Sequence, residues 1–343
     1  MPLITPPMSR RRFLQLGASS LAAAGVLATA PQITAFAGDV GDFLRGPPVP
    51  DIAPTQLAEH VWVIYAEDVF PTPENKGMMC NVTFVVTEDG VVVLDSGGSL
   101  QIGEMAIRMI RTVTDKPVIA VFVSHYHGDH WLGNHAFVNE YGPELPIYAH
   151  PHTRQEIEGV QGDLWRSLME RWTEGATLGT RVVAPNRDTE HGDEYRFGDV
   201  TLRIHHYGVA HTPSDLSLEV VEDRLTYVGD VAMERRIANM DDGSFQGSLD
   251  YLDALVASAK SEVWIPGHGQ PTSNLLTWNR ELFAGIYENC VTAVENMESM
   301  EAARERVLAD PRVAGKAEET RGWDANIGKY ISLAYLEAEQ ALF

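Results

Sequence analysis

Short apolar runs bounded by turn residues recur along the chain as far as residue 265. Such runs are typical of buried or half-buried β-strands. The predicted strands cover residues 61–65, 82–86, 91–94, 118–123, 147–149, 200–206, 216–221, 225–228 and 263–265. Glu88-Asp89-Gly90 is a hairpin turn signal between two of these runs, and the acidic pair Glu222-Asp223 joins another two. The pattern therefore predicts a chain rich in β-structure, with tight turns between neighbouring strands.

A second period, with apolar residues three or four positions apart, separates the strands and predicts helices. The predicted helices cover residues 100–112, 131–139, 152–172 and 249–259. The first of them places Ile102, Met105 and Met109 on one face. From Thr272 onward the strand signals vanish and helical periodicity dominates. We therefore expect residues 276–343 to form a helical C-terminal extension.

The first 37 residues have the organisation of an export signal. Ser9-Arg10-Arg11-Arg12-Phe13-Leu14 resembles the twin-arginine consensus, an apolar run continues to Ala30, and Ala35-Phe36-Ala37 offers a cleavage site before Gly38. An uncleaved membrane anchor is the alternative, but small polar residues interrupt the run, which is short for a spanning helix. We expect recognition by the twin-arginine translocase, a periplasmic mature protein and no stable membrane insertion after cleavage.

Composition narrows the class of protein further. The chain has 343 residues, 44% of them hydrophobic, which is enough for a sizeable core without a disulfide scaffold. Its formal net charge of -22 repels phosphate backbones, so nucleic acid is not an expected partner. The two cysteines, Cys80 and Cys290, either pair or remain free thiols. Residues 38–56, rich in proline and glycine, predict a linker or a surface arm.

Side chains that can bind metal ions are most concentrated in the segment Ser124-His125-Tyr126-His127-Gly128-Asp129-His130. Imidazole and carboxylate are common ligands of zinc and related metals. The first two histidines are two residues apart, so they point the same way on an extended segment. The glycine after them lets the chain turn and aim the next two side chains elsewhere. Because a buried strand leads into this loop, where α/β proteins place their chemistry, we predict a metal site.

Three later stretches share one design, in which a strand is followed by a histidine or an aspartate and by a sharp turn. They are Tyr207–Asp215, which contains His211, Tyr227–Asp230, which ends in Asp230, and Ile265–Gly269, which contains His268. Small residues around each of these side chains let the backbone approach closely. Each stretch therefore offers a further candidate ligand.

Taken in order, these motifs resemble the metallo-beta-lactamase superfamily. The order is Asp95 after an early strand, the His-x-His-x-Asp-His loop, His211, Gly229-Asp230 and Gly267-His268. The resemblance covers residues 57–275. It implies an α/β (α+β) fold, the four-layer αβ/βα sandwich of that family, with two metal ions at one edge of the two sheets.

The resemblance also implies a role for each candidate residue. His125, His127 and His211 resemble the ligands of the first metal, Asp129, His130 and His268 those of the second, and Asp230 the bridging carboxylate. Asp95 would support the loop that holds the histidines rather than bind a metal.

Differences from relatives refine this resemblance. The best-known zinc beta-lactamases have cysteine at the position of Asp230, and the flavo-di-iron relatives have glutamate at that of His127. The ligand set instead resembles that of glyoxalase II-type hydrolases. Asn75-Lys76-Gly77-Met78, Thr114-Asp115-Lys116-Pro117 and Asn134-His135-Ala136-Phe137, together with the export signal, resemble the exported zinc metallohydrolases of quinoprotein and sulfur-oxidation systems.

The implied activity is hydrolysis of a small-molecule ester, thioester or amide, lactams included. Two Zn²⁺ ions would lower the pKa of a shared water and provide a metal-bound hydroxide, which Asp129 would orient as the catalytic residue. One alternative is a sulfur dioxygenase-like oxidoreductase of the same superfamily with a single iron. Another is a non-catalytic binding protein on the same scaffold, against which the complete ligand set argues.

The other histidines have the character of surface or packing residues. They are His60, His135, His150, His152, His191 and His205. For His206 and Tyr126, which lie near candidate ligands in the sequence, a place in the pocket wall stays open.

Replacing Arg10 and Arg11 by lysine is expected to block export, because the translocase recognises the arginine pair itself. Cell fractionation followed by immunoblotting would find the variant in the cytoplasm with its leader uncleaved, whereas the unaltered chain would be periplasmic and begin near Gly38. Unimpaired export of the double variant would contradict the assignment of the signal.

Overall fold

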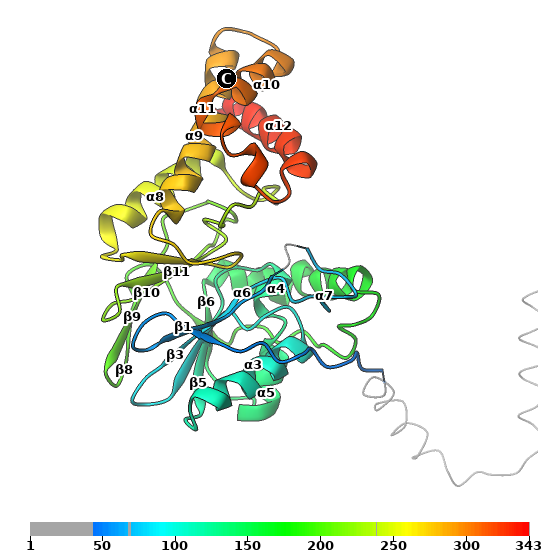
Figure 1. Ribbon diagram of the computed structural model, residues 1–343, viewed down its shortest axis with the longest axis vertical. Helices are drawn as coiled ribbons and strands as arrows, with labels where there is room; N and C mark the ends of the chain where they lie inside the picture. Colours follow the sequence, from blue (N-terminus) through cyan, green and yellow to red (C-terminus); the bar gives the residue numbers. More distant parts are fainter. Residues whose placement is uncertain (1–43, 68–69, 238, 343) are drawn as a thin grey trace, which may run out of the picture. The chain divides into compact units, whose positions relative to one another are not determined.

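The computed structural model describes residues 44–67, 70–237 and 239–342 (Figure 1). The predicted export signal at 1–37 and the beginning of the predicted arm lie outside the described residues. From Arg45 onward the chain forms one compact unit, and the finer division at residues 56 and 275 stays a prediction. Within the described ranges, no helix combines the length and the hydropathy needed to cross a membrane.

The first sheet contains strands from the N-terminal half of the described chain. They are β1 (Thr55–Gln56), β2 (Val61–Ile64), β3 (Val82–Val86), β4 (Val91–Leu94), β5 (Val118–Phe122), β6 (Ile147–Ala149) and β7 (Arg187–Asp188). Their order in the sheet follows their order in the sequence. Pairs from β1 to β4 are antiparallel, whereas pairs from β4 to β7 are parallel.

The second sheet follows in sequence. Its strands are β8 (Glu194–Phe197), β9 (Val200–His205), β10 (Ser217–Val220), β11 (Leu225–Gly229) and β12 (Val263–Pro266). They lie in the order β12-β11-β10-β9-β8. Only β11 and β12 pair in parallel, because helix α8 crosses over between them.

The helices alternate with the strands and then follow them. They are α3 (Leu100–Val113), α4 (Gly128–Trp131), α5 (Asn134–Tyr141), α6 (Pro151–Glu158), α7 (Val160–Trp172), α8 (Phe245–Ser258), α9 (Leu275–Glu295), α10 (Met300–Ala309), α11 (Pro311–Ala314), a 3-10 turn at Ala317–Glu319, and α12 (Trp323–Leu342). The predicted run of helices after Thr272 is therefore confirmed.

The two sheets pack face to face through buried apolar side chains. Val92 and Phe122 of the first sheet belong to the same cluster as Leu202, Leu218 and Tyr227 of the second. Only alternate residues of each strand enter this cluster, because successive side chains point to opposite faces of a sheet. The short apolar runs thus serve two cores at once, one on each face.

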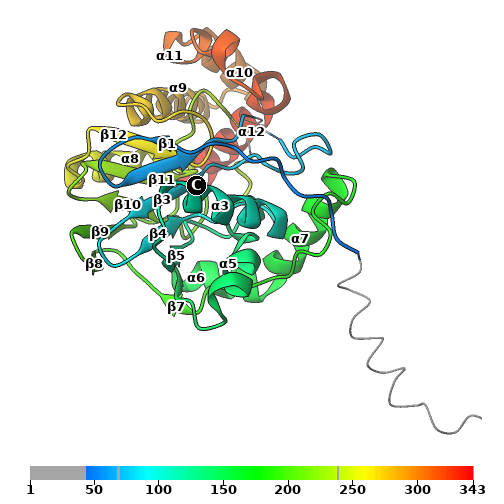
Figure 2. The ribbon, with the colours of Figure 1, turned by 60° about the horizontal axis from the view of Figure 1, so that its bottom comes forward.

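Helices cover the outer faces of both sheets. Val91 and Val93 of β4 pack in one cluster with residues of α3 and α5. On the second sheet, Val228 and Trp264 pack with α8, α9 and the C-terminal helices. The order of layers is helix, sheet, sheet, helix, as Figure 2 shows with α9 and α8 on one side and α3 and α5 on the other. The predicted four-layer fold is confirmed.

Parallel pairing brings several loops to one edge of the sheets. Strands β4, β5 and β6 are parallel neighbours, as are β11 and β12. The carboxyl ends of parallel strands share one edge, so the loops that follow them lie side by side. A hydrogen bond of 2.9 Å from Leu216 N to Ser124 O joins the loop after β5 to the second sheet. Another, of 2.8 Å from Gly267 N to Gly229 O, joins the loops after β12 and β11.

Some local predictions were wrong. The helix predicted at 152–172 is divided into α6 and α7, because Gly159 leaves the helical region with φ −88° and ψ −128°. The pattern at 131–139 is likewise shared between two helices, α4 and α5. Strands β1, β7 and β8 were not predicted. Both β1 and β7 consist of two exposed residues and therefore carry no apolar signal.

One carboxylate connects the last helix to the helical layer of the second sheet. Helix α8 begins at Phe245, earlier than predicted, with Ser244 as its N-cap. Glu337 of α12 accepts hydrogen bonds from Ser244 Oγ at 2.6 Å, Phe245 N at 2.7 Å and Gln246 N at 3.1 Å. The first amides of a helix lack partners within the helix, and its N-terminus favours negative charge. Glu337 therefore stabilises the start of α8.

Replacing Glu337 by alanine is expected to lower the free energy of unfolding by about 1–3 kcal/mol, because three donors at the N-terminus of α8 lose their acceptor. Urea denaturation followed by circular dichroism measures the change. Glu339→Ala, in the same helix, is the control for loss of a negative charge. An equal loss of stability in both variants would argue against the capping role.

Candidate metal centre

The structure brings all the predicted metal ligands together. They are buried and fall into overlapping groups whose nitrogen and oxygen atoms lie within 4.8 Å of one another. The groups are His125, His127 and His211; His125, His130 and Asp230; and Asp129, His130 and His268. Residues as far apart as 125 and 268 in the sequence thus converge on one place.

Strand ends carry these side chains to the shared edge. His125 and His127 follow β5, and the chain then turns into α4, which carries Asp129 and His130. On the second sheet, Asp230 follows β11 and His268 follows β12. His211 lies in the loop after β9.

The first group is formed by His125, His127 and His211. Nε2 of His211 lies 3.0 Å from Nδ1 of His127, and these two rings are nearly perpendicular, at 88°. The ring of His125 lies 4.7 Å from that of His127 and 5.1 Å from that of His211. The three imidazoles therefore face one small volume.

The second group is formed by Asp129, His130 and His268, with Asp230 between the two groups. Oδ2 of Asp129 lies 3.2 Å from Nε2 of His268 and 3.4 Å from Nε2 of His130. Oδ1 of Asp230 lies 3.4 Å from His130 Nε2, whereas its Oδ2 lies 3.3 Å from His268 Nε2 and 3.6 Å from His211 Nε2. Asp230 thus faces both groups with different oxygens.

The arrangement fits divalent metal ions. Four zinc ligands at about 2.0–2.1 Å in a tetrahedron are separated by about 3.3 Å, close to the separations found here. Among the described residues, the buried atoms His125 Nε2, His130 Nε2 and Asp230 Oδ1 have no hydrogen-bond partner. Buried polar atoms without partners are costly, and a bound cation would satisfy them together.

Asp95 supports the loop that carries His125 and His127 without facing the candidate centre itself, as the resemblance implied. Its Oδ1 accepts a hydrogen bond from Ser124 N at 2.7 Å. Its Oδ2 accepts from His130 Nδ1 at 2.7 Å and from the hydroxyls of Ser124 and Tyr227, each at 2.6 Å. Asp95 is fully buried and has a φ of 57°, in the left-handed region that aspartate tolerates better than most residues. One carboxylate therefore orients both the loop and a candidate ligand.

These contacts also decide which ring nitrogens carry protons. The Ser124 hydroxyl donates its only proton to Asp95, so it accepts from His125 Nδ1, 2.9 Å away. His130 donates from Nδ1 to Asp95, and His268 donates from Nδ1 to the carbonyl of Met79 at 2.7 Å. In all three rings Nδ1 is engaged in this way, so Nε2 is the nitrogen left to face the candidate centre.

His127 lies near a carboxylate that no sequence motif indicated. Asp242, between β11 and α8, has Oδ2 3.7 Å from Nε2 of His127. Contact with His127 lowers the pKa of Asp242, and a hydrogen bond from Tyr126 adds to this effect. Nδ1 of His127, on the other side of the ring, faces His211 of the first group. Asp241-Asp242-Gly243 has the character of a turn, but no motif links that turn to His127.

Protonation within the centre suits metal binding. Burial alone would raise the pKa of Asp129 and Asp230, but the neighbouring histidines outweigh it and hold both pKa values below the ordinary range. Burial and the proximity of His127 lower the pKa of His211 to about 3, and His125 is lowered as well. Ionised carboxylates and neutral imidazoles are the forms that bind divalent ions.

His130 behaves differently. Burial opposes its charged form, but the nearby carboxylates of Asp129, Asp230 and Asp95 raise its pKa well above the ordinary value. A divalent ion at Nε2 would replace the proton that this pKa implies. Cys80 Sγ lies 3.3 Å from His130 Nδ1, and burial raises the pKa of this thiol to about 12. Cys80 and Cys290 are both buried and free, which settles the question of pairing.

The remaining histidines lie outside the groups of candidate ligands. His60 contacts Asp223 and Asp199, and His205 contacts Glu219, in line with packing roles. His206 donates from Nδ1 to the carbonyl of Asp215 at 2.9 Å, and its ring lies 4.6 Å from that of His150.

Comparison with known proteins identifies the family. Residues 75–304 match the profile of the family described as the metallo-beta-lactamase superfamily. That match covers more than half of the chain, so this protein belongs to the metallo-beta-lactamase superfamily, and the prediction of an enzyme of this hydrolase family is confirmed.

Solved structures support the fold. A metallo-beta-lactamase from Pontibacter korlensis is 17% identical, with a TM-score of 0.54 over 68% of this chain and 99% of its own. The metallo-beta-lactamase IND-7 is 19% identical, with a TM-score of 0.54 over 68% of this chain and 99% of its own. At these identities the similarity concerns the fold alone.

A curated relative is more similar in sequence. The linear primary-alkylsulfatase of Pseudomonas sp. (strain ATCC 19151) is 25% identical over 267 residues, which are 66% of this chain and 49% of the relative. This chain thus spans about half the length of the curated relative that it matches.

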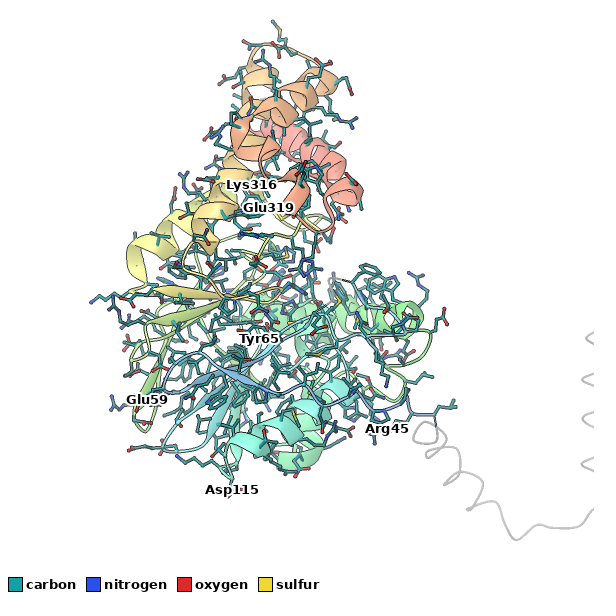
Figure 3. All side chains as sticks on the ribbon, in the orientation of Figure 1. Arg45, Glu59, Tyr65, Asp115, Lys316 and Glu319 are labelled. Carbon is teal, nitrogen blue, oxygen red and sulfur yellow. The ribbon has the colours of Figure 1, made fainter. Side chains whose placement is uncertain are left out.

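Replacing Asp95 by asparagine is expected to weaken metal binding about 10–100-fold, because the amide cannot accept the bonds from His130 and two hydroxyls as a carboxylate does. Asparagine keeps the backbone at a positive φ, so the loop still folds. Competition with a chromophoric chelator measures the affinity. Asp115→Asn, on the surface in Figure 3, is the control, and equal affinities in the two variants would contradict the role of Asp95.

Proposed function

We propose that this chain is a binuclear, zinc-dependent hydrolase of small molecules. In this proposal the first ion is held by His125, His127 and His211, the second by Asp129, His130 and His268, and both by Asp230. The observation that carries it is the convergence of buried, unpartnered atoms on one volume among the described residues. Mixed histidine and carboxylate donors suit zinc better than magnesium or calcium.

Such ions, when bound, lower the pKa of a water molecule and polarise the substrate group that it attacks. Asp129 is the residue that we expect to hold and orient this water. Its Oδ2 faces His268 and His130, which leaves the other oxygen for a hydrogen bond to the water. Its pKa lies below the ordinary range, because His130 and His268 outweigh burial, so it is an ionised acceptor at neutral pH.

The proposed substrate is an ester, a thioester or an amide, lactams included. No nucleophilic side chain is needed for this chemistry. Cys80 is unsuited to that role, because burial raises the pKa of its thiol to about 12 and keeps it neutral. The strongly negative net charge argues against nucleic acid as a substrate.

A primary alkyl sulfate is a second candidate substrate. The similarity to a linear primary-alkylsulfatase over 66% of this chain favours it.

A sulfur dioxygenase-like oxidoreductase with one iron is the competing function. Elemental analysis of protein purified from its native compartment separates the two, since the hydrolase requires about two zinc ions per chain. We further propose that the protein is exported through the twin-arginine route to the periplasm, on the strength of residues 1–37.

Replacing Asp230 by asparagine tests the binuclear centre. A carboxylate can serve two ions and reduce their mutual repulsion, whereas asparagine offers one neutral oxygen. Zinc content is expected to fall from about two to about one per chain. Activity on a panel of chromogenic lactam, thioester and lactone substrates is expected to fall at least about tenfold.

Asp253→Asn, at an exposed salt bridge with Arg280, is the matched control and should keep both ions and full activity. If Asp230 served only to cap the turn after Gly229, asparagine would replace it without loss. An unchanged zinc content would therefore overturn its proposed place between the two ions.

A further inference from the structure

A row of aromatic rings leads away from the candidate metal centre. The ring of Trp165 in α7 lies 4.9 Å from that of His127, tilted by 44°. Trp172, about two turns further along the same helix, lies 6.0 Å from Trp165. Phe70, in the segment between β2 and β3, lies 5.2 Å from Trp172. We call Phe70, Trp165 and Trp172 the aromatic strip.

The aromatic strip is partly open to solvent. The side chain of Phe70 is 54% exposed, and both tryptophans are partly exposed. Trp165 and Trp172 pack against the core cluster of the first sheet without being fully buried, since Gly162 and Met169 are the fully buried residues of α7. Part of each tryptophan therefore remains accessible. Neighbouring exposed rings are unfavourable in water, and a contiguous apolar surface next to a reactive centre suits a ligand.

The position of the strip is set by close packing against the ligand loop. A Cβ placed on Gly128 would lie 2.6 Å from Cβ of Trp165. Glycine at this position therefore lets α7 approach the loop that carries the candidate ligands. Met169, between the two tryptophans in sequence, is fully buried and holds the helix against the core.

The two flanks of His127 differ in character. Trp165 lies against its ring on one side, whereas the partly exposed carboxylate of Asp242 faces its Nε2. A substrate group extending from the centre towards Asp242 meets a negative charge. A group extending towards Trp165 meets a succession of aromatic faces.

We propose that the aromatic strip binds a linear apolar chain of the substrate while the reacting group lies at the candidate metal centre. This inference rests on the proposed hydrolase function and narrows its substrate class to esters with a long alkyl or acyl chain. Continuity from His127 sets the order of contact, in which the chain meets Trp165 first, then Trp172 and finally Phe70.

The experiment uses the zinc-loaded protein and p-nitrophenyl esters of linear alkanoic acids, from acetate to decanoate. In the unaltered protein, each added methylene that reaches the strip is expected to raise kcat/KM about two- to fourfold. In Trp172→Ala the rise of kcat/KM with chain length should stop at a shorter chain than in the unaltered protein. The kcat/KM for the acetate ester should stay within about twofold of that of the unaltered protein. Trp172→Phe should restore most of the rise, because it keeps an aromatic face.

Phe70 is the last ring of the strip, counted from His127. The kcat/KM values of Phe70→Ala should therefore match those of the unaltered protein for short and medium chains and fall below them only for the longest esters. In Trp172→Ala the fall should begin at a shorter chain. Leu336→Ala, which shortens a 45% exposed side chain of α12, is the control for loss of an exposed apolar group and should leave the whole series unchanged. A uniform loss across all chain lengths in Trp172→Ala, or an unchanged series, would overturn the proposal.

Binding measurements separate this proposal from the proposed function. Dissociation constants of the alkanoate anions from hexanoate to dodecanoate are measured by titration calorimetry on the same proteins. If no ester is hydrolysed, the ester hydrolase function fails, but a chain-length dependence that Trp172→Ala removes would still support the strip. Hydrolysis without any dependence on chain length, in rate or in binding, would refute the strip alone.

Discussion

The structure depends on a concentration of buried polar atoms that lack ordinary hydrogen-bond partners. Among the described residues, His125 Nε2, His130 Nε2 and Asp230 Oδ1 are buried without partners and face one volume. Removing such groups from water costs several kcal/mol, more for charged ones, unless something within the protein compensates. Divalent cations at this place would supply that compensation, so the fold and the ions that we propose stabilise each other.

Three imidazoles at the centre, those of His125, His130 and His268, are each held by a hydrogen bond at Nδ1, which directs Nε2 inward. Asp95 holds His130 and, through Ser124, the loop of His125. The carbonyl of Met79 holds His268. Because these partners come from both the loops and the strand ends of a four-layer core, the geometry of the centre follows from the packing of the whole domain. The affinity for metal ions and the protonation states of the candidate ligands therefore depend on the fold that holds them.

The surroundings of the centre come from other parts of the chain than the candidate ligands. The ligands lie at strand ends and in α4, whereas the aromatic strip belongs to α7 and to the segment between β2 and β3. Reactivity and substrate preference can thus vary separately, as is common where loops and helices surround a rigid core. The C-terminal helices are attached elsewhere, through the helical layer of the second sheet and Glu337.

The sequence by itself determined the apolar strands, the helical end of the chain and the candidate ligands, but not β1, β7 and β8. Those features are local. The pattern that predicts a strand lies in consecutive residues, and the candidate ligands from His125 to His130 lie in one short segment of the chain. Only the tertiary structure decided that Asp242 lies near His127, that Cys80 lies beside His130, and that α7 places an aromatic strip next to the centre. The physical reason is that these contacts join residues distant in sequence. The local pattern around one residue of such a pair does not indicate which distant residue it will contact.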